Sequence, residues 1–308
     1  MRKLGKNCAV DADRNKPPRM PWKELARHGL VQVRQYSCTA CAGDPPEAEQ
    51  FGRTSISIVQ SGVFEIRTER RPQLLTSGFL LLGNAGQTYE ASHEHGGKDR
   101  CLVFDFQEAV LEEFAQSLRR GARHRPFAVN VLAPLPRADA LRHLAEERLR
   151  SDASALGLEE IGLSLAAYVL REAGAGVPRP CADRAVEPGA RERVLAAIER
   201  IEQSAEEELR LGGLAQSAGL SAFQFLRLFK KETGVTPYRF LLQARIRQAV
   251  ALLRDTSRSV TDIAFDVGFG DLSNFINTFR REVGCSPRQY RKTGLLGQIR
   301  FSSARRVI

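Results

Sequence analysis

A cluster of histidine, cysteine and acidic residues in the first third of the chain has the chemistry to bind a metal ion. The run His93-Glu94-His95 is followed by Asp99 and Cys101. On a β-strand, residues two apart share a face, so His93 and His95 can converge. Imidazole and thiolate together suit a zinc-like ion, and the predicted metal ligands are therefore His93, His95 and Cys101.

The sequence leaves three interpretations of this cluster. In the first, His93 and His95 lie at a strand end or in a loop, and the nearby thiols are structural. In the second, the cluster forms a metal-binding or thiol-based sensor, to which Cys38 and Cys41 add further thiols. In the third, the chain is an oxygenase-like enzyme, because the His-x-His motif with Asp99 is similar to the metal motif of cupin enzymes. Those enzymes carry Glu at that place and a second histidine motif, which this sequence lacks.

A second set of residues, near the C-terminus, has the chemistry to read DNA. Arg and Asn side chains match the donor and acceptor patterns of guanine and adenine edges in the major groove. Basic residues at helix ends neutralise phosphates and fix the register of the protein on the duplex. The predicted contact residues are Phe223, Gln224, Arg227, Lys231, Ser273, Asn274, Asn277, Arg280 and Arg281.

A sequence motif that occurs twice defines the helices that must position these residues. Residues 229–237 read FKKETGVTP, and residues 279–287 read FRREVGCSP, at an offset of 50. A sequence repeated at roughly this period is one supersecondary unit used twice. In both copies the glycine is expected to end one helix, and the Ser/Thr-Pro pair is expected to start the next.

Each repeated unit is predicted to be a helix-turn-helix. The second helix of the first unit should span residues 222–232, capped by Ser221, with Gln224 placed to close a capping box. In the second unit, Asp271 should cap a helix over residues 272–282. A long connecting helix would place the units in neighbouring major grooves, about 34 Å apart. The residues expected to pack in the core are Phe225, Phe229, Phe275 and Phe279.

The charge of the chain is concentrated in this repeated region. The 308 residues carry a net charge of +10, with a pI near 9.6. Residues 205–308 hold 17 Lys and Arg against 9 Asp and Glu, so most of the excess belongs to them. Such a balance favours a polyanionic partner. No apolar stretch is long enough to span a membrane and residues 1–20 lack the apolar core of a signal peptide, which predicts a cytoplasmic protein without a membrane partner.

Residues 205–292 resemble the DNA-binding domain of the AraC/XylS family of bacterial transcription regulators. The matching positions are Ile263-Ala264, Gly268-Phe269, Phe275, Phe279-Arg280-Arg281, Gly284, Ser286-Pro287 and Tyr290-Arg291. The resemblance implies contacts to double-stranded DNA from both recognition helices. It also implies a contact with RNA polymerase.

The N-terminal region resembles, more weakly, the cupin-like effector-binding domain of many AraC-type regulators. The similar pieces are residues 62–64, residues 77–79 and the strands around the histidines. The predicted fold is α+β, with an N-terminal cupin-like β domain with flanking helices and a C-terminal all-α domain of two helix-turn-helix units. The predicted boundaries are residues 1–30 for an N-terminal segment, 31–173 for the sensor or dimerisation domain, 174–190 for a linker, 191–292 for the DNA-binding domain and 293–308 for a basic tail.

Two functions follow from these patterns. The leading prediction is a transcription regulator without enzyme activity, whose N-terminal domain binds a small-molecule effector or forms a homodimer. The alternative is a metal-dependent cupin-type enzyme fused to a DNA-binding module. A zinc-like metal is the cofactor that the histidine and cysteine cluster would hold under either interpretation.

Overall fold

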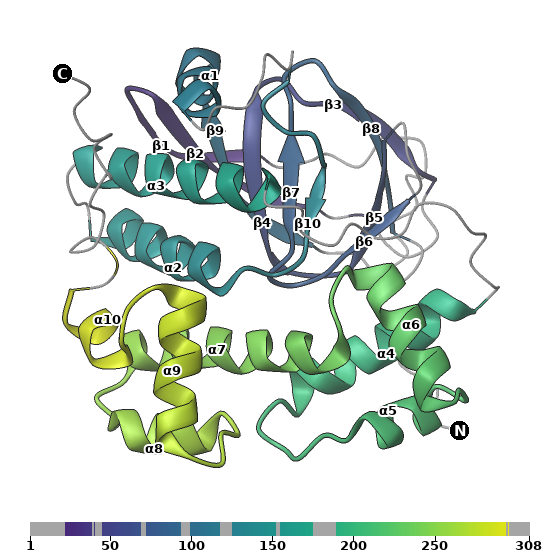
Figure 1. Cartoon of the computed structure of the whole chain (residues 1–308). Helices are drawn as coiled ribbons and strands as arrows, with labels where there is room; N and C mark the ends of the chain where they lie inside the picture. Colours follow the sequence, from purple (N-terminus) through teal and green to yellow (C-terminus); the bar gives the residue numbers. More distant parts are fainter. Residues whose placement is uncertain are drawn as a thin grey trace, which may run out of the picture.

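Short segments of alternating apolar and polar residues build two antiparallel sheets in the first half of the chain (Figure 1). The computed structural model describes residues 22–38, 40, 45–68, 72–93, 99–117, 125–151, 155–174, 189–293 and 295. The six-stranded sheet has the order β1-β2-β9-β4-β7-β10, and the four-stranded sheet has the order β3-β8-β5-β6. The strands are β1 (Trp22–His28), β2 (Val31–Ser37), β3 (Glu47–Gln50), β4 (Thr54–Ser61), β5 (Phe64–Arg67), β6 (Gln73–Leu75), β7 (Leu80–Gly83), β8 (Thr88–Ser92), β9 (Arg100–Phe106) and β10 (Val131–Leu132).

The larger sheet includes a strand from the predicted N-terminal segment, because β1 spans Trp22–His28. Strand β1 pairs with β2 from Trp22 opposite Tyr36 to His28 opposite Val31. The Trp22 ring packs against Tyr36, with ring centroids 4.8 Å apart. As an edge strand with mostly exposed side chains, β1 lacks the apolar alternation that identifies a half-buried strand.

Three helices, which come after the first nine strands, cover the larger sheet. They are α1 (Glu108–Ser117), α2 (Pro136–Arg150) and α3 (Ala155–Gly174), which confirms the predicted amphipathic helices of this region. Their buried residues, such as Leu141, Ile161 and Leu165, join Ile56 and Phe104 of the sheet in one core. Helices α2 and α3 lie between the larger sheet and the C-terminal helices (Figure 1).

The C-terminal half is entirely helical among the described residues. Its elements are α4 (Ala190–Gln203), α5 (Leu211–Ser217), α6 (Ala222–Thr233), α7 (Pro237–Asp255), α8 (Val260–Asp266), α9 (Leu272–Val283) and α10 (Pro287–Thr293). Helix α7 contributes to both units: Phe240 and Leu241 pack with α4, α5 and α6, whereas Val250 and Leu253 pack with α8, α9 and α10. The two helix-turn-helix units therefore share one connecting helix, as predicted.

The predicted helix boundaries rest on caps that the structure confirms. Ser221 and Gln224 form the capping box at the start of α6. The Oδ1 atom of Asp271 accepts a hydrogen bond from the Asn274 backbone N–H at 2.7 Å at the start of α9. Glycines end both helices, with φ of 81° at Gly234 and 98° at Gly284, a conformation that side chains with a Cβ rarely adopt.

The N-terminal and C-terminal domains pack directly against each other. Helix α2 contacts α7 and α9, and β6 contacts α6. Arg191 of α4 also connects the two domains. It donates to Glu65 Oε2 of β5 at 2.7 Å and to Glu232 Oε2 of α6 at 3.4 Å. Most of the predicted linker, and the basic tail apart from residues 293 and 295, lie outside the described residues.

Candidate functional site

The second helices of the two units, α6 and α9, each present an outward face of polar and basic residues. Most of the predicted contact residues are exposed, whereas Lys231 is half-buried. Phe223 is the largest of them and is 73% exposed. The exposed members of the set are Phe223, Gln224, Arg227, Ser273, Asn274, Asn277, Arg280 and Arg281.

Buried phenylalanines fix the orientation of both helices. Phe225 and Phe229 of α6 are fully buried with ring centroids 5.7 Å apart, and Phe275 and Phe279 of α9 repeat this arrangement at 5.7 Å. Because residues three and four apart share a helix face, these pairs hold the opposite face of each helix outward. The four residues are core residues, as predicted.

The outward side chains differ in how far their polar groups are already occupied. Gln224 Oε1 accepts hydrogen bonds from the Ser221 backbone N–H at 3.1 Å and from its hydroxyl at 2.9 Å, so this side chain stabilises the helix start. Asn274 Oδ1 accepts from the Thr278 hydroxyl at 3.3 Å. The side chains of Arg227, Asn277 and Arg280 make no hydrogen bond or ion pair with another described residue. All of their polar groups are therefore available to contact a base or a phosphate.

Arg281 lies at the border of the outward face. Its Nε donates to Glu282 at 3.1 Å. It also lines a crevice of about 330 Å³ between α9 and the N-terminal helices, together with Arg137, Tyr168 and Arg239. A DNA contact from Arg281 would therefore compete with its hydrogen bond to Glu282 and its position in this crevice. A DNA contact from Arg280 would not face this competition.

A cavity of about 480 Å³ lies inside the β domain and is lined by residues of both sheets. Its lining combines aromatic rings with polar groups, including Arg34, Tyr36 and Tyr89. The Arg34 guanidinium is held by two hydrogen bonds to Asp105, at 2.5 and 2.8 Å, and lies 4.1 Å from the centre of the Trp22 ring. The volume is in the range of small-molecule binding pockets.

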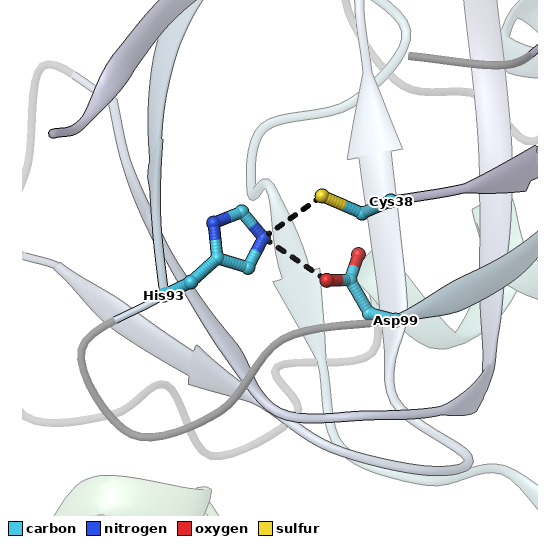
Figure 2. Close-up of side chains that lie close together, drawn as sticks. All are labelled: Cys38, His93 and Asp99. Carbon is cyan, nitrogen blue, oxygen red and sulfur yellow. Dashed lines mark hydrogen bonds and ion pairs between the residues drawn. The ribbon is translucent and has the colours of Figure 1, made fainter. Parts of the chain in front are cut away.

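The predicted metal ligands are only partly brought together. His93 and Cys101 both line the cavity, whereas His95 lies outside the described residues. Among the described residues, the group whose side-chain atoms lie close enough to hold an ion consists of Cys38, His93 and Asp99, and it does not include Cys101 (Figure 2). Cys38 directly follows β2, whose last residue pairs with the first residue of β9, and this long-range register places Cys38 beside Asp99.

The local environment perturbs the protonation of this cluster. The close approach of Asp99, and then of Cys38, raises the pKa of His93 to about 10. Burial raises the pKa of the Cys101 thiol well above its usual value, with the charge of Asp99 adding to the effect. Cys101 is therefore a neutral thiol at neutral pH, whereas His93 carries a proton when no metal ion competes for it.

Comparisons with known proteins find relatives of the C-terminal domain. A family model described as a helix-turn-helix domain matches residues 214–293. The transcriptional activator RhaS of Enterobacter sp. (strain 638) is 42% identical over 92 residues, which are 30% of this chain and 33% of RhaS. The transcriptional regulator MtrA of Neisseria gonorrhoeae is 33% identical over 97 residues, 32% of each protein. Residues 214–293 are therefore similar to the DNA-binding part of these transcriptional regulators.

The similarity to AraC/XylS regulators is confined to part of each protein. The chain spans about a third of the length of the curated relatives it matches. Among solved structures, an AraC-type transcriptional regulator from Chromobacterium violaceum is 30% identical, covers 34% of this chain and 96% of that one, and has a TM-score of 0.32. Within the described part of the chain, every helix is too short or too polar to cross a membrane.

Proposed function

We propose that this chain is a transcription regulator of the AraC/XylS type that binds double-stranded DNA in a sequence-specific manner through α6 and α9. The observation that carries the proposal is the pair of helices with buried phenylalanines on one side and exposed polar residues on the other. An α-helix fits the major groove, where each base pair shows its own pattern of donors and acceptors.

The two outward faces carry different residues at equivalent positions. Phe223 corresponds to Ser273, and Arg227 corresponds to Asn277, at the repeat offset of 50. Arg favours a guanine edge and Asn favours an adenine edge. One chain should therefore read two unlike half-sites in tandem, in adjacent major grooves, rather than a palindrome.

The N-terminal domain is proposed to be a cupin-like module that binds a small molecule in its cavity. The two antiparallel sheets and the cavity of about 480 Å³ between them support this role. Direct packing of this domain on α6, α7 and α9 offers a physical route by which a ligand could change DNA affinity. Contact with RNA polymerase and homodimerisation remain predictions of the sequence.

The alternative of a cupin-type enzyme has no support from the relatives, which are transcriptional regulators. The geometry of the Cys38, His93 and Asp99 group also differs from a nucleophilic relay. In such a relay the histidine uses one nitrogen for the nucleophile and the other for the carboxylate. Here Nε2 of His93 faces both partners (Figure 2).

A binding experiment with the full chain tests the DNA-binding function. A duplex selected from a random pool and a scrambled duplex of equal length would be compared by fluorescence anisotropy over a range of salt concentrations. We expect the selected duplex to bind at least about a thousandfold more tightly, and we expect both affinities to fall steeply as salt rises. Equal affinity for the two duplexes would contradict sequence-specific recognition.

A further inference from the structure

Three side chains from separate segments of the β domain converge on one point. Cys38 follows β2, His93 follows β8 and Asp99 precedes β9. Their potential ligand atoms all lie within 4.8 Å of one another. All three side chains are buried, with relative exposures of 5%, 6% and 1%. Solvent-exposed acidic groups often cluster by chance, but a buried thiol, imidazole and carboxylate in contact need a physical reason.

Two of the three separations in this group are close to those of a tetrahedral metal site. The Cys38 Sγ atom lies 3.5 Å from His93 Nε2, which lies 3.0 Å from Asp99 Oδ1. Zinc bonds of about 2.3 Å to sulfur and about 2.0–2.1 Å to nitrogen and oxygen imply separations of about 3.6 Å and about 3.3 Å in a tetrahedron. These two separations are within a few tenths of an ångström of the tetrahedral values, and the third, between Cys38 Sγ and the Asp99 carboxylate, is at most 4.8 Å.

The hydrogen bonds of the cluster leave one buried acceptor unsatisfied. Among the described residues, Asp99 Oδ1 has no hydrogen bond of acceptable geometry, although it lies 3.0 Å from His93 Nε2. A single N–H on this nitrogen cannot point at both Cys38 and Asp99 (Figure 2). A cation between the three atoms would satisfy the sulfur, the nitrogen and the oxygen together.

The backbone and neighbouring rings support these side chains before any ion arrives. The Cys38 N–H donates to the Asp99 carbonyl oxygen at 2.8 Å, which ties two of the segments together. The Ala40 N–H donates to Cys38 Sγ at 3.3 Å, which fixes the position of the sulfur. The Phe64 ring stacks on His93, with centroids 6.3 Å apart and planes at 30°. Such outer contacts are typical of metal sites, where they hold the ligands in place.

We propose that Cys38, His93 and Asp99 bind one divalent transition-metal ion, with zinc as the best match. Sulfur, nitrogen and oxygen donors in one small site favour zinc over magnesium or calcium, which prefer all-oxygen sites. His93 and Asp99 also line the cavity of the β domain. The fourth coordination position therefore faces that cavity and is open to water or to a donor atom of a small molecule. The proposal is independent of DNA binding.

Cobalt binding to the full chain tests this site. Reduced, metal-free protein would be titrated anaerobically with Co²⁺, and the absorbance would be recorded. We expect saturation at one equivalent, with a thiolate-to-cobalt charge-transfer band that disappears when Zn²⁺ is added. The Cys38→Ser variant should lose this band and bind Zn²⁺ at least about tenfold more weakly.

Cys101→Ser is the matched control, because Cys101 is an equally buried thiol that lines the same cavity. It should keep the cobalt band and the affinity for zinc. Absence of saturable cobalt binding by the wild-type chain would overturn the proposal, and so would equal losses in the two cysteine variants. The wild-type titration decides the first point even if a variant fails to fold. DNA affinity measured on the same samples shows separately whether the proposed function holds.

Discussion

Arg227 and Asn277 are the residues on which direct base recognition most depends in this account. They occupy equivalent positions of α6 and α9, are exposed, and make no hydrogen bond or ion pair within the described structure. Removing the Arg227 guanidinium should cost about 1–3 kcal/mol of binding free energy on the preferred duplex and relax base preference in one half-site. Anisotropy titration of Arg227→Ala measures this loss.

Arg67→Ala is the matched control for that prediction. Arg67 is an equally exposed arginine, but it lies on β5 in the other domain, 3.7 Å from Glu90. Its removal should leave DNA affinity unchanged. An equal loss in both variants would mean that Arg227 acts only through the overall charge of the chain.

Two phenylalanines of α6, separated by one residue, are expected to have opposite roles. Phe223 is 73% exposed, whereas Phe225 is fully buried. Phe223→Ala should change the free energy of unfolding by less than about 0.5 kcal/mol but weaken DNA binding, because an apolar side chain can contact a thymine methyl group. Phe225→Ala should cost about 3–5 kcal/mol of stability by leaving a cavity.

Chemical denaturation and DNA titration of the two variants check this pair. Stability and DNA affinity are expected to separate, because Phe225 contributes to stability and Phe223 to DNA affinity. A strong destabilisation by Phe223→Ala would show that its side chain is not free on the surface.

At the scale of the elements, the recognition helices depend on their caps. Asp271 accepts from the Asn274 backbone N–H at 2.7 Å, whereas the nearby Ser273 is exposed on the outward face. Asp271→Ala should therefore lower the free energy of unfolding by about 0.5–2 kcal/mol. Ser273→Ala should leave stability within about 0.5 kcal/mol. Thermal melting of both variants makes the comparison, and equal melting temperatures would contradict the capping role.

At the scale of the whole molecule, Arg191 connects the two domains. Its guanidinium donates to Glu65 on β5, to Glu232 on α6 and to the Pro72 carbonyl oxygen at 3.0 Å. Both carboxylates are buried, so Arg191→Ala removes the cation that they share and should cost about 3–5 kcal/mol of stability.

Arg200→Ala is the matched control, since Arg200 forms an exposed ion pair with Glu207 at 2.7 Å within the C-terminal domain. Such surface pairs contribute about 0–1 kcal/mol. Denaturation of the two variants separates a buried interdomain contact from a surface pair. Similar small effects in both would show that the domains do not depend on Arg191 for their packing.

The sequence predicted those features that are encoded locally. The caps of α6 and α9, the buried phenylalanines and the terminal glycines each involve residues within one or two turns of helix, so their spacing is visible in the chain. Strand β1 was not predicted, because its partner β2 supplies the hydrogen bonds and its own side chains are mostly exposed.

The local sequence pattern also could not predict that Cys38, His93 and Asp99 form one group. Asp99 and Cys101 are near His93 in the chain, but Cys38 lies 55 residues before it. Only the pairing of β2 with β9 brings Cys38 to Asp99. The sequence does show that Cys38 directly follows an alternating segment, which is typical of a strand. The register between this strand and a distant one could not be deduced from that pattern.

The most direct test of the account is selection of duplexes from a random pool by the full chain and by two variants. We predict a preferred sequence with two unlike blocks about one helical turn apart. Arg227→Ala should lose base preference in one block, and Asn277→Ala should lose it in the other. If the wild-type chain selects no preferred sequence at low salt, or if both variants change the same block, the proposal that α6 and α9 read two different half-sites is wrong.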